Sequence, residues 1–288
     1  MFTDIKGNKR YKINLHMHTT DSDGHKTPAE AAEIYRNKDY DAIAITDHWI
    51  VGEEREIDGM PIIAGCEYHF GIDPAEDYVY HIVSLFHEKD PMVELTDSPQ
   101  TCVNKIIAAG GMPVLAHPAW SLNDPREAIK LEGIEFTEIF NTISGEGSSN
   151  RPYSGCFVDL CACKGKLYGL LAADDTHGYK RDCTVASIMV KADSLSREDI
   201  MKAIRDHDFY ATTGPEVHVE VKDRIINIEC TPAVKVDIFT NAAWSAGRHT
   251  VGENITHVSV PLSKIDKFAR VEVTDENGRV AYSNLIKV

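Results

Sequence analysis

The sequence has 288 residues, of which 43% are hydrophobic and 26% are charged, and these proportions are ordinary for a soluble globular protein. Its formal net charge of −15 repels nucleic acid and anionic membranes, so we expect neither as a partner. No apolar run approaches the roughly 20 residues that a membrane span needs, and the opening MFTDIKGNKRYK lacks the apolar core of a secretory signal, so we expect a cytoplasmic protein.

Short and almost uniformly apolar segments recur through the first 175 residues, and we predict a strand in each. They cover residues 11–18, 41–46, 60–67, 80–86, 112–118, 134–141 and 166–175. Such segments are typical of strands that are buried on both faces of a parallel sheet. Helical patterns cover residues 27–38, 98–111, 124–133 and 196–208, and Thr27 and Ser98 are expected N-caps before a proline. The alternation predicts an α/β fold with a parallel sheet or a barrel.

The pattern changes after Gly214 and Pro215. Segments such as EVHVEVKDRIINIEC and ARVEVTDENGRVAYSN alternate apolar and polar residues with a period of two, and DENGR is a strong turn signal. Several short strands at regular spacing predict a sandwich-like fold. We therefore predict an α/β domain over residues 1–214 and a small all-β domain over residues 215–288.

Histidines and carboxylates stand at the ends of most of the predicted α/β strands. In INLHMH, the alternation places Ile13, Leu15 and Met17 on one face and both His16 and His18 on the other. Other strand ends carry Asp47, His48, Glu67, His81, His117, Asp175 and His177. In α/β folds ligands bind outside the carboxyl ends of the strands, so this set of nitrogen and oxygen ligands predicts a metal site there.

The ordered series LHMHTTDSDG, AITDH, AGCE, YHIVSLF, LAHP and AADDTHG resembles the polymerase and histidinol phosphatase (PHP) superfamily across roughly residues 10–215. The segment DHDFYATTGP, followed by the all-β domain, resembles the branch of that superfamily named after bacterial carbaryl hydrolases. The resemblance implies a distorted (β/α)7 TIM-like barrel. It also implies a metal-dependent phosphoesterase that uses two to three divalent metal ions, which would be manganese, iron or zinc.

Carried over motif by motif, the resemblance implies nine metal ligands. A first metal would be bound by His16, His18 and Asp175, a second by His81 and His117, and a third by Asp23, His48 and His177, while Glu67 would bridge the first two. The family spacing of an aspartate two residues before the histidine selects Asp175 rather than Asp174. Asp174, like Asp47 and Asp21, is expected to support the site or cap a turn.

The implied reaction is the hydrolysis of a small-molecule phosphate ester, either a monoester or a cyclic ester or diester. Water held between the metals would attack phosphorus, with Glu67 and Asp175 as the catalytic carboxylates and Asp175 exchanging the proton. Three divalent ions, less three carboxylates and a hydroxide, leave about +2, which would attract an anionic substrate to an acidic protein. Predicted substrate contacts come from Arg151, Lys180, Arg181 and His69, and Glu138 and Asn141 are expected to line the pocket.

Structural roles for the predicted substrate contacts, and other functions for the metal site, remain as alternatives to phosphate ester hydrolysis. The three cationic residues are equally consistent with solvated surface charges, and His69 with a structural role. The same metal site could instead hydrolyse carboxylic or carbamic esters, as the branch name suggests. A non-catalytic, metal-binding PHP module is the alternative of a different class.

Overall fold

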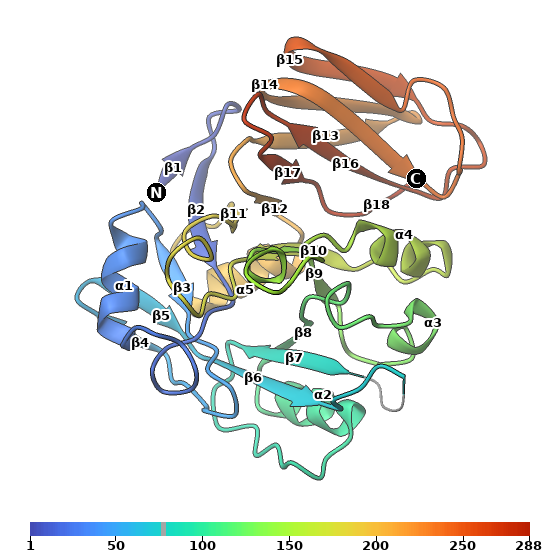
Figure 1. Ribbon diagram of the computed structural model, residues 1–288. Coiled ribbons are helices and arrows are strands. Elements are labelled where there is room, and N and C mark those ends of the chain that lie inside the picture. The colour runs from blue at the N-terminus through green and yellow to red at the C-terminus, as the bar shows by residue number, and fades with distance from the viewer. Residues whose placement is uncertain (76–78) are drawn as a thin grey trace.

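The structure, a computed structural model, describes residues 1–75 and 79–288 and is a mixed α/β protein with many strands and few helices (Figure 1). Its described strands form two sheets. The larger follows the order β13 (Val217–Lys222), β14 (Ile225–Thr240), β16 (Phe268–Thr274), β17 (Val280–Tyr282), β12 (Phe209–Thr212), β11 (Ser187–Val190), β2 (Lys9–Asn14), β3 (Ala42–Ala44), β5 (Met60–Ile63), β4 (Arg55–Ile57), with β1 (Phe2–Thr3), β15 (His249–Pro261) and β18 (Ile286–Lys287) pairing beside it. The smaller follows the order β10 (Gly169–Ala173), β9 (Phe136–Asn141), β8 (Met112–Leu115), β7 (Tyr80–Leu85), β6 (Gly65–Phe70).

The described helices are α1 (Pro28–Arg36), α2 (Pro99–Ala108), α3 (Pro125–Ala128), α4 (Gly155–Cys163) and α5 (Arg197–Arg205), with a 3₁₀ turn η1 (Ile143–Gly145). Helices α1, α2, α3 and α5 begin at the start of the predicted helical segments, whereas α4 was not predicted. The Thr27 hydroxyl accepts the Glu30 amide while the Glu30 carboxylate accepts the Thr27 amide, so α1 has a full capping box. At the start of α2, the Ser98 hydroxyl accepts the Thr101 amide. None of the helices in the described part of the chain is long and apolar enough to cross a membrane.

Every predicted strand segment contains a strand, but the α/β part is not a regular repeat of seven strands and helices. β2, β3 and β5 are parallel to one another, and so are β8, β9 and β10. β7, however, is antiparallel to β6 and β8, and β11 is antiparallel to β2 and β12. Residues 71–79 are too few for the crossover of roughly a dozen residues that parallel neighbours need, which explains the departure from a (β/α)7 barrel at this hairpin.

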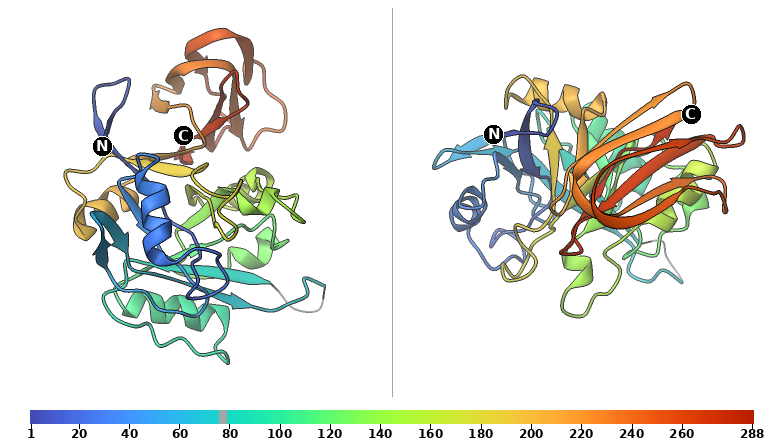
Figure 2. Two further views of the ribbon diagram at one scale, coloured as in Figure 1. Left: turned by 60° about the vertical axis from the view of Figure 1, so that its left-hand side comes forward. Right: turned by 90° about the horizontal axis from the view of Figure 1, so that it is seen from above.

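The two sheets share one buried apolar cluster, and Figures 1 and 2 show how the sheets are arranged. β5 continues into β6 across Ala64, and β10 contacts β11 and β12 on the other side. Ile13, Ile82 and Leu170 belong to a single buried apolar cluster that both sheets share. The carboxyl ends of the parallel strands open on one side of this core. The start of β7 lies there as well, because β7 runs in the opposite direction.

Strands β13 to β18, which we call the β unit, continue the larger sheet. β17 pairs with β12, where Ala211 lies opposite Tyr282 and Thr212 lies opposite Ala281. The apolar cluster of the β unit also takes in Met189 of β11 and Tyr210 of β12. The sheet therefore crosses the boundary predicted at residue 214, and the division into two domains stays a prediction.

A buried arginine ties the β unit to helix α4. Arg270 of β16 is 1% exposed, and its Nε and Nη2 lie 2.7 and 2.8 Å from the two carboxylate oxygens of Asp159. Its Nη1 pairs with Glu272, and its Nη2 donates to the Tyr153 hydroxyl at 3.2 Å. Phe239 lies beneath the guanidinium at 3.9 Å. The contact fixes the segment that enters α4 against the β unit.

We expect the substitution Arg270→Ala to reduce the free energy of unfolding by about 3 kcal/mol, because it leaves two carboxylates largely buried without their cation. Urea denaturation followed by circular dichroism measures this change. The matched control is Lys202→Ala, which removes an exposed pair with Asp206 and should cost less than about 1 kcal/mol. Equal losses in the two variants would contradict the role assigned to Arg270.

Candidate metal centre

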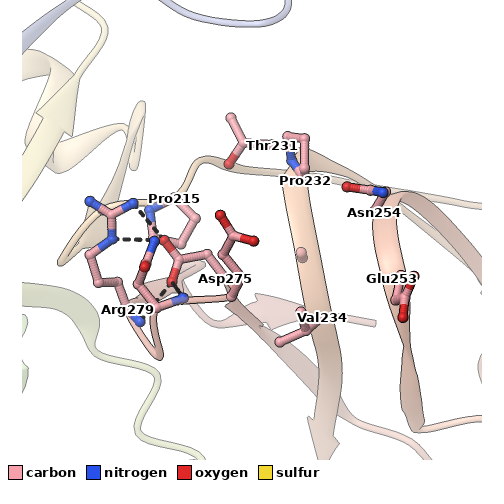
Figure 3. Close-up of a pocket in the computed structure, with 12 residues that line it drawn as sticks. Pro215, Thr231, Pro232, Val234, Glu253, Asn254, Asp275 and Arg279 are labelled. Carbon is pink, nitrogen blue, oxygen red and sulfur yellow. Dashed lines mark hydrogen bonds and ion pairs between the residues drawn. The ribbon is translucent and has the colours of Figure 1, made fainter.

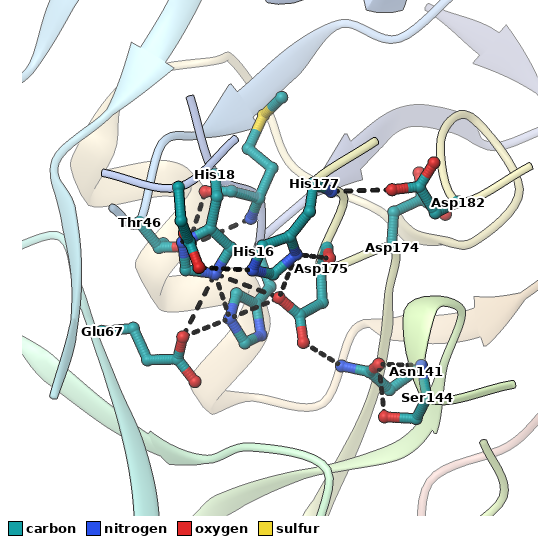
Figure 4. Close-up of polar contacts among 12 residues, drawn as sticks. His16, His18, Thr46, Glu67, Asn141, Ser144, Asp174, Asp175, His177 and Asp182 are labelled. Carbon is teal, nitrogen blue, oxygen red and sulfur yellow. Dashed lines mark hydrogen bonds and ion pairs between the residues drawn. The ribbon is translucent and has the colours of Figure 1, made fainter. Parts of the chain in front are cut away.

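The nine side chains predicted as metal ligands lie together where the carboxyl ends of the parallel strands open, and Figure 4 shows part of them. They form three groups, and within each group the ligand atoms lie within 4.8 Å of one another. The groups are His16, His18, Glu67 and Asp175; Glu67, His81 and His117; and His18, Asp23, His48 and His177. Glu67 belongs to two groups, as a bridging ligand would. His18 also belongs to two, which the sequence did not indicate.

Glu67 of β6 stands between the first two groups, and its side chain is 1% exposed. Its Oε2 lies 3.2 Å from Nε2 of His16 and 3.1 Å from Nε2 of His18. Its Oε1 lies 2.8 Å from Nδ1 of His81 and 3.3 Å from Nε2 of His117. Oε2 also lies 3.2 Å from Nδ1 of His48. The two oxygens thus face separate sets of imidazoles, which is the arrangement that a carboxylate shared by two metal ions requires.

Asp175 faces the first group from the end of β10. Its Oδ1 lies 3.0 Å from Nε2 of His18 and 3.3 Å from Nε2 of His16. Its backbone has a φ of 52°, and its amide donates to the His16 carbonyl at 2.8 Å, so a left-handed turn aims the carboxylate at the histidines. The preceding Asp174 points elsewhere and accepts the Tyr35 hydroxyl at 2.7 Å. The spacing that selected Asp175 agrees with this geometry.

The sequence suggested that Glu138 and Asn141 line the pocket. They do not, and both lie buried behind the ligands instead. One oxygen of Glu138 is 2.8 Å from Nδ1 of His16, and the other accepts the His117 amide at 2.8 Å. The Asn141 side chain donates to Glu138 at 2.8 Å and to Asp175 at 3.1 Å. Because Nδ1 of His16 is held by a carboxylate, its Nε2 is left to face the metal groups.

Two further aspartates hold the loops that carry the third group. Asp47 accepts the Thr19 amide at 2.7 Å and the Ser22 hydroxyl at 2.6 Å, which supports the role expected of it. Asp182 accepts the amide of His177 at 2.7 Å (Figure 4). Sequence reasoning missed Asp182, because its contact depends on how the loop after β10 folds back.

The residues present fit divalent cations. Nδ1 of His48 and Oδ1 of Asp175 are buried without a hydrogen-bond partner, although both atoms face other members of the groups. The Nε2 atoms of His16 and His18 lie only 3.4 Å apart, a pair that one shared cation would satisfy. Imidazoles and carboxylates without a thiolate suit manganese, iron or zinc.

The carboxylates keep protons on two of the imidazoles. Burial lowers the pKa of His18, but hydrogen bonds and charges from Asp175 and Glu67 outweigh burial and raise this pKa to about 9. Burial also lowers the pKa of His16, but the charges of Asp175, Glu67 and Glu138 outweigh burial. The pKa of His16 is therefore raised well above its ordinary value. A metal ion binds the neutral imidazole, so these protons must leave when metal enters.

We therefore expect metal loading near pH 7.5 to release about one proton or more per chain, and apparent metal affinity to rise with pH up to the pKa of His18. Titration calorimetry of the metal-free protein with Zn²⁺, in two buffers that differ in ionisation enthalpy, measures the release. Identical heats in both buffers would show that the imidazoles are already neutral.

A cavity of about 300 Å³ opens onto the ligands. Seven predicted ligands line it, namely Asp23, His48, Glu67, His81, His117, Asp175 and His177. Its remaining lining comes from Trp120, Ile143, Ser144 and Ser149, none of which the sequence singled out. The volume is at the small end for ligand sites, so it suits a small molecule.

The predicted substrate contacts are placed less favourably. Arg151, Lys180 and Arg181 are exposed, and the cavity lining contains none of them. His69 is exposed as well, but its ring packs against His48 at 5.1 Å, so it stands beside the ligands. A role in substrate binding stays a prediction for all four residues.

A larger cavity, of about 540 Å³, lies in the β unit (Figure 3). Pro232 and Val234 of β14 line it together with Asn254 of β15 and the ion pair of Asp275 with Arg279. Within residues 1–75 and 79–288, the groups able to hold a metal ion include no residue of this cavity. The chemistry-bearing residues are therefore concentrated at the strand ends instead.

No model of a protein family matches the chain, and no curated protein matches it either. A solved two-domain protein from Bacteroides vulgatus, containing a predicted PHP-like metal-dependent phosphoesterase, is similar to it with a TM-score of 0.55 and 16% identity. The similarity covers 99% of this chain and 98% of that one, so the two proteins share a fold along their whole length.

Two shorter similarities concern hydrolase-type proteins. An amidohydrolase from Chromobacterium violaceum, solved with sulfate and no metal, matches 59% of this chain and 89% of its own, with a TM-score of 0.43 and 16% identity. A candidate metal-dependent phosphoesterase from Bifidobacterium adolescentis matches 58% of this chain and 87% of its own, with a TM-score of 0.44 and 15% identity.

Proposed function

We propose that this protein is a metal-dependent phosphoesterase of the PHP type that hydrolyses a small-molecule phosphate ester. The observation that carries the proposal is the position of Glu67, whose Oε1 faces two imidazoles and whose Oε2 faces three, one of them His48 of the third group. The fold shared with the Bacteroides protein supports it. The carbaryl-hydrolase branch remains part of the proposal, because DHDFYATTGP leads into the β unit here.

The proposed ligands divide as the three groups do. His16, His18 and Asp175 would hold one ion, His81 and His117 another, and Asp23, His48 and His177 a third, with Glu67 shared between the first two. When bound, two to three divalent ions of manganese, iron or zinc would lower the pKa of water and neutralise the phosphoryl oxygens.

Asp175 is the proposed proton acceptor. Burial raises its pKa, but the charge of His16 and a hydrogen bond from His18 outweigh burial and lower the pKa below its ordinary value. The carboxylate is therefore ionised, and its Oδ1, which lies 3.0 Å from Nε2 of His18, would take a proton from the attacking water. Asn141 holds the other oxygen at 3.1 Å, which fixes the direction of transfer.

Hydrolysis of carboxylic or carbamic esters at the same residues is the second candidate. It is favoured by the cavity lining, where the described residues include no lysine or arginine that would bind an anionic substrate. A neutral ester needs no such cation. Under the leading proposal, the bound ions themselves attract the phosphate.

Turnover of p-nitrophenyl phosphate, bis(p-nitrophenyl) phosphate and p-nitrophenyl acetate by protein loaded with manganese, iron or zinc tests the proposal. We expect phosphate ester turnover that is lost on chelation and regained when metal is restored. Turnover of the acetate alone would favour the second candidate. Fewer than two metals per chain and no turnover would favour a non-catalytic module.

A further inference from the structure

The cavity has one wall that the metal ligands do not make. Trp120 and Ile143 supply apolar surface to this wall, and Ser144 and Ser149 supply hydroxyl groups. The described lining contains no lysine or arginine beside them. The wall therefore offers a flat aromatic surface and an aliphatic side chain, with no positive charge for a second anionic group.

Trp120 is held in a defined place on that wall. Its indole Nε1 donates to the Ser149 hydroxyl at 3.0 Å. Its ring stands nearly perpendicular to the rings of His117 and His81, with centroids 5.0 and 5.5 Å away. Although held on these sides, the residue remains 39% exposed. An aromatic surface thus adjoins the group of Glu67, His81 and His117 and stays open to a ligand.

We propose that Trp120 is a specificity-determining residue that receives the apolar or aromatic leaving group of the substrate. The inference rests on the proposed phosphoesterase function and adds the class of ester: a phosphate ester of an uncharged alcohol that carries a flat or apolar group. Such a group would bury its surface against the indole and Ile143. A leaving group with its own phosphate or carboxylate would meet no cationic side chain in the described lining.

Benzyl phosphate and ethyl phosphate test this inference, because both release a primary alcohol and benzyl phosphate has a phenyl ring where ethyl phosphate has a methyl group. We expect kcat/KM to be about 10-fold higher for benzyl phosphate, and the substitution Trp120→Leu to remove most of this preference. Trp120→Phe should retain it in large part, and Ser149→Ala should weaken it by loosening the indole. The Kd of benzylphosphonate, measured by titration calorimetry, should rise about 10-fold in Trp120→Leu.

The control is Trp244→Leu, which changes a tryptophan that is 86% exposed in the β unit and should alter neither substrate. An equal fall for both esters in Trp120→Leu would overturn the inference, whether metal content falls with it or not. An unchanged preference would overturn it as well. If metal-loaded wild-type protein cleaved no phosphate ester, the proposed function itself would fail. If only the inference about Trp120 failed, metal-loaded wild-type protein would still cleave ethyl phosphate, so the two failures can be told apart.

Discussion

The substitution Glu67→Gln is expected to lower phosphate ester turnover by about 10³-fold or more, the largest effect of any single change in this chain. Both oxygens of Glu67 face imidazoles, so the neutral amide removes a charge shared by two groups of ligands. Metal content should fall together with activity, because the amide presents an NH₂ group to one of these groups. Elemental analysis by mass spectrometry and a p-nitrophenyl phosphate assay measure the two quantities.

Glu53→Gln is the matched control for this change, since Glu53 is exposed and belongs to none of the ligand groups. It should keep the metal content and turnover of the wild type. Full metal content in Glu67→Gln, with activity near that of the control, would contradict a bridging role.

His117→Ala is expected to remove about one metal ion per chain and about 10²-fold to 10³-fold of the activity. The imidazole is buried, its Nε2 lies 3.3 Å from Glu67, and the group that contains it has only two other members. His16 and His18 keep their own contacts with Asp175, so the first group should still load. The loss of about one ion here, against a fall in both groups that contain Glu67, separates this variant from Glu67→Gln.

His257→Ala controls for the loss of a histidine, because His257 is exposed on β15. Activity and metal content should stay at wild-type values in that variant. If His117→Ala retained the metal content and turnover of the wild type, the second group would not be a metal site.

The sequence predicts the position of the site well, because its signals are local. His16 and His18 stand at the end of one predicted strand, and Asp175 and His177 stand at the end of another. Such residues lie at the carboxyl edge of the sheet whatever path the loops take. Glu67 lies in the middle of β6 rather than at its end, so the strand-end rule alone does not place it, although it faces five histidines from other segments. The resemblance to the PHP superfamily then divided these residues into groups.

Other features depend on long-range geometry that no local pattern carries. β11 and β12 have four residues each and were not predicted, and their place in the larger sheet depends on pairing with β2 and β17. The antiparallel direction of β7 is set by the hairpin before it rather than by its own apolar residues. Trp120 follows the AHP motif in sequence, yet its contact with Ser149 depends on a loop 29 residues further on.

The pairing of β17 with β12 has a consequence for cutting the chain. A protein that ended at residue 214 would keep every ligand of the proposed metal centre, but it would expose an unpaired strand edge along Ala211 and Thr212. It would also uncover the apolar side chains of Met189 and Tyr210. Open edges of this kind promote self-association. The part that ends at residue 214 should therefore aggregate when expressed alone, and the intact chain should melt in one transition rather than two.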